Sequence, residues 1–269
     1  MASEAGSVTR DAPDARDIVA KADTGARAPA GWQGRLIVGL CLAWSLFQLY
    51  IASALPTTLA TATGVSFFAN IITDSRFIHL AFAMGLATLA FPLGRRAARD
   101  HIPAYDWVLF TLAVGACLYL VVFREAIAQR PGLWTTGDLV AASIGMASLF
   151  VAVYRSLGLP LTIIAAVFMS FTLFGGEFAW IREITNYGGA SFSRAMGHYW
   201  MQTEGVFGVA LGVSTSMIFL FVLFGALLER AGGGNWFIQV AIALLGALRG
   251  GPAKARSEER RVGKECATG

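Results

Sequence analysis

The stretch VFGVALGVSTSMIFLFVLFGALL, residues Val206 to Leu228, contains no Asp, Glu, Lys or Arg. About 20 apolar helical residues are enough to cross the ~30 Å hydrocarbon core of a bilayer. The composition of the whole chain is consistent with a membrane protein, because 56% of its 269 residues are hydrophobic and 14% are charged. An ordinary soluble domain has roughly 25% charged residues. The sequence therefore predicts an all-α, polytopic transmembrane protein.

Five further stretches are long and apolar enough to span a membrane, and a seventh is shorter. These six are Leu36–Leu55, Phe77–Leu93, Tyr105–Phe123, Asp138–Tyr154, Leu159–Phe174 and the short Trp236–Leu248. The few residues between the fourth and fifth spans predict an antiparallel helical hairpin. We leave open whether 236–248 spans the membrane or is re-entrant. The first stretch ends in Ala52-Ser53-Ala54, but it is too long for a signal-peptide core, so we expect a retained helix.

Residues 1–34 have mixed charge and no sustained apolar period, so we expect a disordered leader. Its basic residues, with one at its edge, are Arg10, Arg16, Lys21, Arg27 and Arg35. With the N-terminus inside, the inner loops carry Arg95, Arg96, Arg99, Arg155 and Arg230, and the outer loops carry Arg76, Arg124, Arg130, Arg182 and Arg194. The inner and outer loops carry five arginines each. The basic residues of the leader therefore decide the orientation, and under the positive-inside rule they favour a cytoplasmic N-terminus.

The predicted helix centres hold no ionisable side chains, which mark proton relays and charged sites at membrane depth. Their polar residues are Ser45, Gln48, Thr111, Ser143, Thr162, Ser170, Thr172, Ser214, Thr215 and Ser216. We expect most of them to support helix packing by bonding the carbonyl one turn earlier or a neighbouring helix. Gly208 and Gly212 should permit close helix approach.

No pattern of an enzyme or a metal site occurs. His79, His101 and His198 are far apart and have no ligand spacing with Cys or carboxylates, so we expect interfacial polar groups. The chain lacks a P-loop, a GxGxxG and a GxSxG motif. We therefore predict no enzyme activity and no catalytic, cofactor-binding or metal-binding residue. Basic residues at helix ends reflect topology, so nucleic acid is not an expected partner.

The loop from Glu177 to Glu204 mixes aromatic and charged residues. Its aromatics include Trp180, Tyr187, Tyr199 and Trp200, and its arginines are Arg182 and Arg194. Interfacial anchoring explains the aromatics. Because this loop lies on the predicted outer face, contact with a periplasmic partner is a second hypothesis.

The C-terminal residues differ in character from the rest. RSEERRVGKEC, Arg256 to Cys266, reads like an in-frame translation of a common sequencing adapter. We expect residues 256–269 to be adapter-derived and the native reading frame to continue differently after Ala255. A solvated cytoplasmic tail is the alternative.

Thr203 to Ala255 resembles the opening of the large membrane subunit of tripartite ATP-independent periplasmic (TRAP) transporters. The most telling pieces are FVLFGALLERAG, Phe221 to Gly232, and LLGALRGGPAKA, Leu244 to Ala255. The preceding helices resemble those of fused permeases that work with TAXI-type solute-binding proteins. This resemblance implies a small-subunit-like scaffold with an outer loop over 35–200 and the start of a transport domain over 201–255.

The resemblance further implies a multi-pass protein of the bacterial inner membrane that imports a small solute, typically an organic anion, on a sodium gradient. The family's Gly/Ser-rich hairpin for substrate and sodium should follow Ala255, so the substrate-binding residues are unknown and this chain is expected to be inactive alone. Its partners would be a periplasmic TAXI-type binding protein, the solute and the lipid bilayer. A non-transporting membrane scaffold or sensor is the main alternative, and an integral-membrane enzyme is the second.

Overall fold

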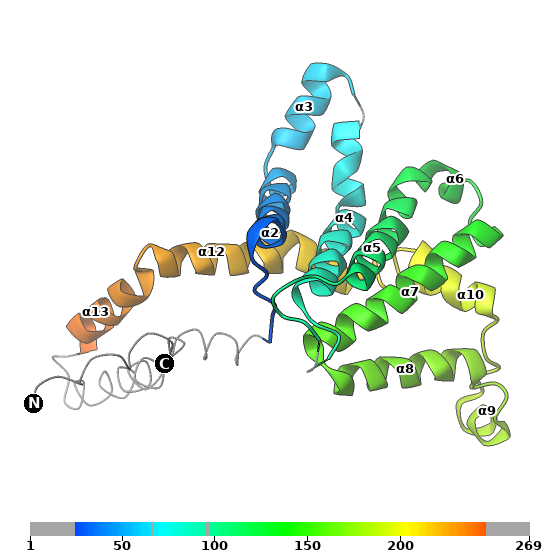
Figure 1. Cartoon of the computed structure of the whole chain (residues 1–269). Coiled ribbons are helices and arrows are strands. Elements are labelled where there is room, and N and C mark those ends of the chain that lie inside the picture. The colour runs from blue at the N-terminus through cyan, green and yellow to red at the C-terminus, as the bar shows by residue number, and fades with distance from the viewer. Residues whose placement is uncertain (1–24, 66, 95–96, 246–269) are drawn as a thin grey trace, which may run out of the picture. The chain divides into compact units, whose positions relative to one another are not determined.

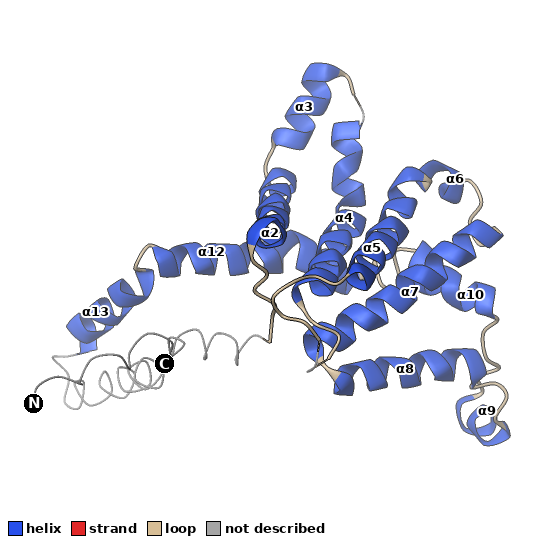
Figure 2. Ribbon diagram, viewed as in Figure 1, coloured by secondary structure: helices blue, strands red, loops and turns tan. Residues whose placement is uncertain are grey.

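The computed structural model describes residues 25–65, 67–94 and 97–245, and within these ranges every regular element is a helix (Figure 1). Figure 2 shows helices joined by loops, with no strand in the same ranges. The predicted all-α membrane fold is confirmed. Residues 1–24 of the leader and the adapter-like tail lie outside the described residues, so both remain predictions.

The helices follow one another with few long connections. They are α2 Gly31–Ala52, α3 Leu55–Thr63, α4 Phe67–Ala90, α5 Ala104–Val122, α6 Arg124–Ala128, α7 Thr136–Leu157, α8 Leu159–Phe174, α9 Ala179–Thr185, α10 Phe192–Met196, the π-helix η1 Gly197–Met201, α11 Val209–Val213, the π-helix η2 Ser214–Ile218, α12 Phe219–Arg230 and α13 Gly233–Leu245.

Each predicted apolar stretch is found as a helix, with α8 at the predicted bounds. Four helices of the described chain are both long and apolar enough to cross a membrane, namely α2, α5, α7 and the continuous helix Val209–Arg230. At 16 residues, α8 is apolar but shorter. Six spanning helices were predicted, so α4 and α8 fall outside this stricter criterion of length and composition.

Helix α4 differs most from its prediction, because it begins at Phe67 rather than Phe77. It ends at Ala90, just before Pro92, since the residue preceding a proline is disfavoured in a helix. The turn that leads into it from α3 contains Gly64, whose φ of 68° is left-handed. Glycine takes this conformation without steric cost.

Helices α7 and α8 are joined by a single residue, Gly158, with φ 85°. The predicted close connection is thus confirmed and is tighter than the few residues expected. The N-terminus of α7 carries a capping box in which Thr135 and Asp138 satisfy each other's backbone N–H groups.

The core lies where α4, α5 and α7 meet the segment from α10 to Phe207. Met84, Cys117, Ala142, Trp200 and Phe207 are almost fully buried there. The rings of Trp200 and Phe207 pack edge to face with centroids 5.1 Å apart. A loop segment that was expected at the membrane surface therefore returns into the centre of the bundle.

Two units make up the chain, and Arg27–Leu223 forms the one that holds this core. Residues Phe224 to Leu245 belong to the other unit and contain the end of α12 and all of α13. Within the first unit, α8 buries none of its residues and α2 buries only Gln48. These apolar helices present large hydrophobic side chains outward, as expected of surfaces that face lipid.

Gly145 of α7 gives a direct test of the core. A Cβ at this position would overlap the Trp200 indole ring, so Gly145→Ala should destabilise the protein by about 1–3 kcal/mol. Thermal unfolding of the purified chain in detergent measures the effect. Gly115→Ala in α5 is the matched control, because a Cβ there meets nothing within 4 Å. Equal unfolding temperatures for the two variants would contradict this packing.

Candidate functional site

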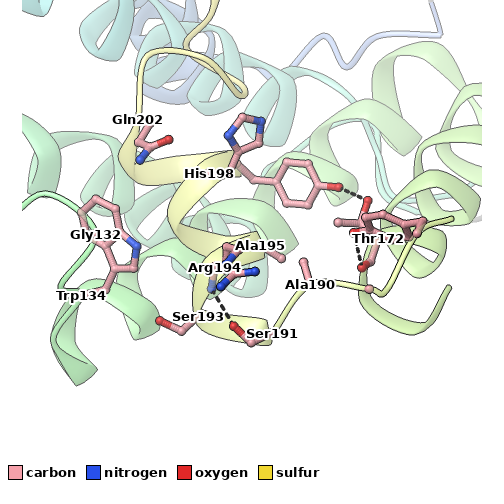
Figure 3. A pocket seen from close by; sticks show the side chains of 13 residues that line it. Gly132, Trp134, Thr172, Ala190, Ser191, Ser193, Arg194, Ala195, His198 and Gln202 are labelled. Carbon is pink, nitrogen blue, oxygen red and sulfur yellow. Dashed lines mark hydrogen bonds between the residues drawn. The ribbon is translucent and has the colours of Figure 1, made fainter. Parts of the chain in front are cut away.

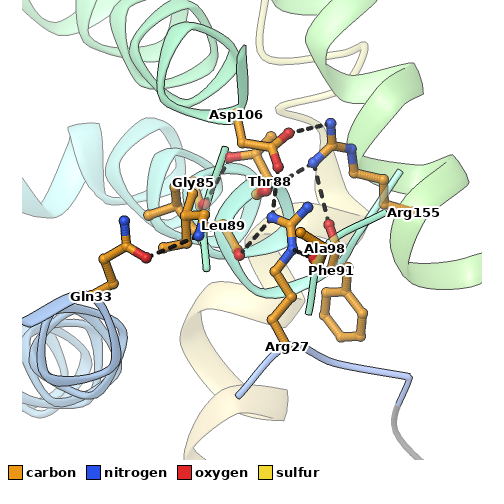
Figure 4. A network of polar contacts seen from close by, with 10 residues as sticks. Arg27, Gln33, Gly85, Thr88, Leu89, Phe91, Ala98, Asp106 and Arg155 are labelled. Atoms are coloured by element: carbon orange, nitrogen blue, oxygen red, sulfur yellow. Dashed lines mark hydrogen bonds and ion pairs between the residues drawn. The ribbon is translucent and has the colours of Figure 1, made fainter. Parts of the chain in front are cut away.

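A buried ion cluster lies at the end of the bundle where α4 and α7 finish and α5 begins (Figure 4). Arg27 Nη1 lies 2.6 Å from Asp106 Oδ2, and Arg155 Nη2 lies 2.6 Å from Asp106 Oδ1. All three side chains have 0% exposed surface. One carboxylate is thus shared by two guanidinium groups in a site without contact to solvent.

The excess positive charge of this cluster is met by backbone carbonyls at the end of α4 and in the loop that follows it. Arg155 Nη1 donates to Thr88 O at 2.8 Å and to Phe91 O at 3.2 Å. Arg27 donates to Leu89 O at 3.3 Å and to Ala98 O at 2.9 Å. The last carbonyls of a helix have no partner within the helix and carry the negative end of its dipole, so cations are favoured there.

The position of Arg27 contradicts part of the prediction that the leader is disordered. Residues 1–34 were expected to be disordered, but α2 begins at Gly31 and the Arg27 side chain is buried in the bundle. Gln33 also accepts a hydrogen bond from the Ile102 N–H at 2.9 Å. The physical reason is specific pairing to Asp106, which a composition argument about charge does not register.

Asp106 gives the second test. Asp106→Asn would keep the shape of the side chain but leave two buried guanidinium groups without a counter-charge, so we expect a loss of about 3–5 kcal/mol in the free energy of unfolding. The control is Asp100→Asn in the neighbouring loop, where the side chain is 86% exposed. Thermal unfolding of both variants in detergent should show a large decrease for the first alone, and an unchanged Asp106→Asn variant would refute the role of the cluster.

The opposite end of α5 and α7 has its own carboxylate. Asp138 accepts from the Tyr119 hydroxyl at 2.8 Å, from Arg130 at 3.2 Å, and from the Thr135 N–H and hydroxyl at 2.8 Å each. Its side chain is fully buried. These contacts fix the loop between α6 and α7 to the end of α5.

Helix α4 carries charges within its length, which corrects the expectation that helix centres lack ionisable groups. Asp74 pairs with Arg124 at 3.2 Å, and Arg76 Nη1 donates to Phe207 O at 3.0 Å. The prediction failed because α4 starts ten residues earlier than the apolar run, so residues assigned to an outer loop lie inside the helix.

His79 also lies inside α4, in the bundle rather than at an interface as predicted. Its Nδ1 accepts from Trp44 Nε1 at 3.2 Å and contacts the Gln48 side-chain amide nitrogen. Because these groups donate to Nδ1, the ring proton of the neutral imidazole is placed on Nε2. Nε2 lies 3.5 Å from Ser214 Oγ. A polar chain thus joins α2, α4 and the π-helix η2. By contrast, His101 is exposed in a loop.

A recess of about 600 Å³ opens beside the loop that follows α8, and Figure 3 shows the side chains that line it. This volume is typical of small-ligand and side-chain pockets. Its polar lining residues include Thr172, Tyr187, Ser191, Ser193, Arg194, His198 and Gln202. Arg194 is the charged group of this lining, which contains no Asp or Glu. The recess is therefore suited to polar or anionic partners.

The aromatic residues predicted in this loop have different roles. Tyr187 and Tyr199 tie the loop to the end of α8, because their hydroxyl groups donate to Thr172 O at 3.0 Å and to Thr172 Oγ1 at 2.6 Å. Trp180 is exposed, as expected of an interfacial anchor. Trp200 was predicted to be such an anchor, but it is fully buried in the core.

Most of the hydroxyl residues predicted to support helix packing do bond the carbonyl four residues earlier. This holds for Ser45, Thr111, Ser143, Thr162, Thr172, Thr215 and Ser216, with distances of 2.7–3.0 Å. Gln48 and Ser214 contact His79 instead. Of the two glycines, Gly212 permits a close approach, because a Cβ there would lie 2.8 Å from the Arg76 guanidinium.

In the described part of the chain, no group of three His, Cys, Asp or Glu residues is arranged to hold a metal ion. The two cysteines of this part, Cys41 and Cys117, are free thiols. The notable sites are therefore the ion cluster, the polar chain through His79 and the recess beside Arg194.

Comparison with known families identifies part of the chain. Residues 144–256 match the family described as tripartite ATP-independent periplasmic transporter, DctM component. The match supports a TRAP transporter membrane component. Curated proteins and solved structures give no match.

The matched segment covers less than half of the chain and begins within α7. It includes α8, most residues that line the loop recess, both π-helices, α12 and α13, whereas α2 to α6 and the recess residues Gly132 and Trp134 lie outside it. The family match begins at residue 144, and the resemblance places the start of the transport domain at residue 201. The boundary between scaffold and transport domain stays a prediction.

Proposed function

We propose that the chain belongs to the fused permease of a TAXI-type TRAP transporter, which imports a small organic anion using an ion gradient, with sodium as the coupling ion. The match of residues 144–256 to the DctM component carries this proposal. The four long apolar helices support a multi-pass membrane protein, which we place in the bacterial inner membrane with a cytoplasmic N-terminus.

Within this transporter, α2 to α8 would act as a static scaffold. Ion pairs hold both ends of the α4, α5 and α7 core, fully buried at Asp106 on one end and partly buried at Asp138 on the other. Breaking such pairs by removing one partner is strongly unfavourable. Elements tied in this way are poor candidates for the moving part, which favours motion elsewhere in the transporter.

We further propose that the recess beside Arg194 contacts the periplasmic solute-binding protein. It lies at the end of the bundle that becomes the outer face under the predicted orientation, opposite Asp106. Its lining offers one cation and several hydroxyl and aromatic groups but no acid. Such a surface is complementary to an acidic side chain on a partner.

Site-specific photocrosslinking in the native cells tests this contact. A benzophenone amino acid at Ser193, which lines the recess, should give an adduct with an exported solute-binding protein, whereas the same amino acid at His101 in the opposite loop should not. Arg194→Ala should weaken the adduct several-fold because it removes the cation of the recess. Arg182→Ala is the matched control, since Arg182 is exposed outside the recess.

An adduct at His101 but not at Ser193 would overturn both the proposed orientation and the partner surface. An adduct that is equally strong in both arginine variants would remove the recess from the contact while leaving the partner in place.

Transport itself is tested with the native gene amplified from source DNA, because we expect its reading frame to continue past Ala255. Membrane vesicles containing this protein should accumulate radiolabelled succinate, 2-oxoglutarate or glutamate when an inward sodium gradient and the solute-binding protein are both supplied. Vesicles with the 269-residue chain are the comparison and should show no uptake. Uptake without sodium would mean that sodium is not the coupling ion. The absence of any uptake would favour the non-transporting scaffold or sensor.

A further inference from the structure

Five arginines of the described chain are buried or half-buried, and four of them have a carboxylate partner. Arg27 and Arg155 pair with Asp106, Arg124 with Asp74, and Arg130 with Asp138. Arg76 is the fifth, and among the described residues no carboxylate lies within ion-pair distance of it. Because charges removed from water are normally paired, this exception needs an explanation.

Asp74 does not supply the missing counter-charge, although it is close to Arg76 in sequence. Residues two apart on an α-helix point about 200° away from each other. Arg124 already occupies Asp74 at 3.2 Å.

The Arg76 side chain lies at an open recess of about 420 Å³ between the end of α2, helix α4, and α11 with η2. One of its nitrogens, Nη1, is bound to Phe207 O at 3.0 Å. The guanidinium lies against Gly212, whose missing side chain makes room for it. The remaining N–H groups have no hydrogen-bond partner among the described residues.

Hydrogen-bond donors in the recess are few and well defined. The hydroxyl groups of Thr215 and Ser216 already donate to Leu211 O and Gly212 O. Ser75 lines the recess, is 9% exposed, and has no hydrogen-bond partner among the described residues. The available donors are thus the Arg76 guanidinium and the Ser75 hydroxyl, beside apolar walls formed by side chains such as Ile51 and Val213.

From this arrangement we infer that the recess is a binding site for a small organic carboxylate with an apolar body. The carboxylate accepts hydrogen bonds from the Arg76 guanidinium and the Ser75 hydroxyl, and the apolar part lies against the aliphatic wall. A guanidinium matches the geometry of a carboxylate and forms charge-assisted hydrogen bonds with it.

This site is separate from the recess beside Arg194, and it does not depend on transport. It joins α2 and α4, which lie outside the family match, to α11 and η2, which lie inside it. Occupancy would therefore bridge the proposed scaffold and the TRAP-like segment. Binding can be measured on the chain as it exists, whether or not it moves a solute.

The test is fluorine NMR of para-fluorobenzoate with the full chain in phosphatidylcholine nanodiscs. We expect saturable binding, and we expect the neutral isostere para-fluorobenzamide to bind much more weakly. Arg76→Gln should weaken carboxylate binding about tenfold or more, because charge-assisted hydrogen bonds are lost. Arg76→Lys should retain part of the affinity. Arg182→Gln is the matched control and should bind like the unmodified chain, because Arg182 is exposed and lines neither recess.

Two further variants keep the test valid if Arg76→Gln fails to fold. Val209→Trp changes a side chain that is 80% exposed and lines the recess, so it should block binding while Arg76 is intact. Ser75→Ala should weaken binding by a few-fold, because it removes one neutral donor. Equal binding of the acid and the amide, unchanged binding in Arg76→Gln and Val209→Trp, or loss of binding in Arg182→Gln would each overturn the proposal.

Discussion

The carboxylate of Asp106 is the contact on which the rest of the bundle depends. It joins the first turn of α5, the last turn of α7 and the segment before α2, while the two arginines that it pairs with also satisfy carbonyls at the end of α4. Four parts of the chain are thus held at one point. The helix dipoles complement these charges, because α5 starts at this side and α4 and α7 end there. The start of a helix favours a carboxylate, and the end of a helix favours a guanidinium.

The length of the apolar runs predicted the helices well where each helix is uniformly apolar. Helix α8 has the predicted bounds and α5 is shifted by one residue at each end, because Gly158 and Gly175 flank α8 and Pro103 precedes α5. It failed for α4, where Asp74 and Arg76 lie inside the helix. Asp74 is paired with Arg124, and one Arg76 nitrogen donates to the Phe207 carbonyl. Both partners are distant in sequence, so the neighbouring residues alone suggest a loop at these charges.

The candidate sites were less predictable than the fold. The loop with Arg194 stood out by composition. The recess, however, also needs Thr172 of α8 and Trp134 of the loop before α7, and their proximity to this loop is not visible in the sequence. Trp200 was misassigned because an aromatic residue near a membrane end has the same sequence signal whether it faces lipid or the core. The pairing of His79 with Gln48 and Ser214 required the three-dimensional arrangement of α2, α4 and η2. A clue was present, since Gln48 is the one amide side chain in its apolar run.

The junction at Gly158 has a consequence for how this protein is made. A single residue between α7 and α8 leaves no loop that could wait on one side of the membrane while the second helix is synthesised. We therefore expect the two helices to enter the membrane together as one helical hairpin, because the junction has no slack to place them independently.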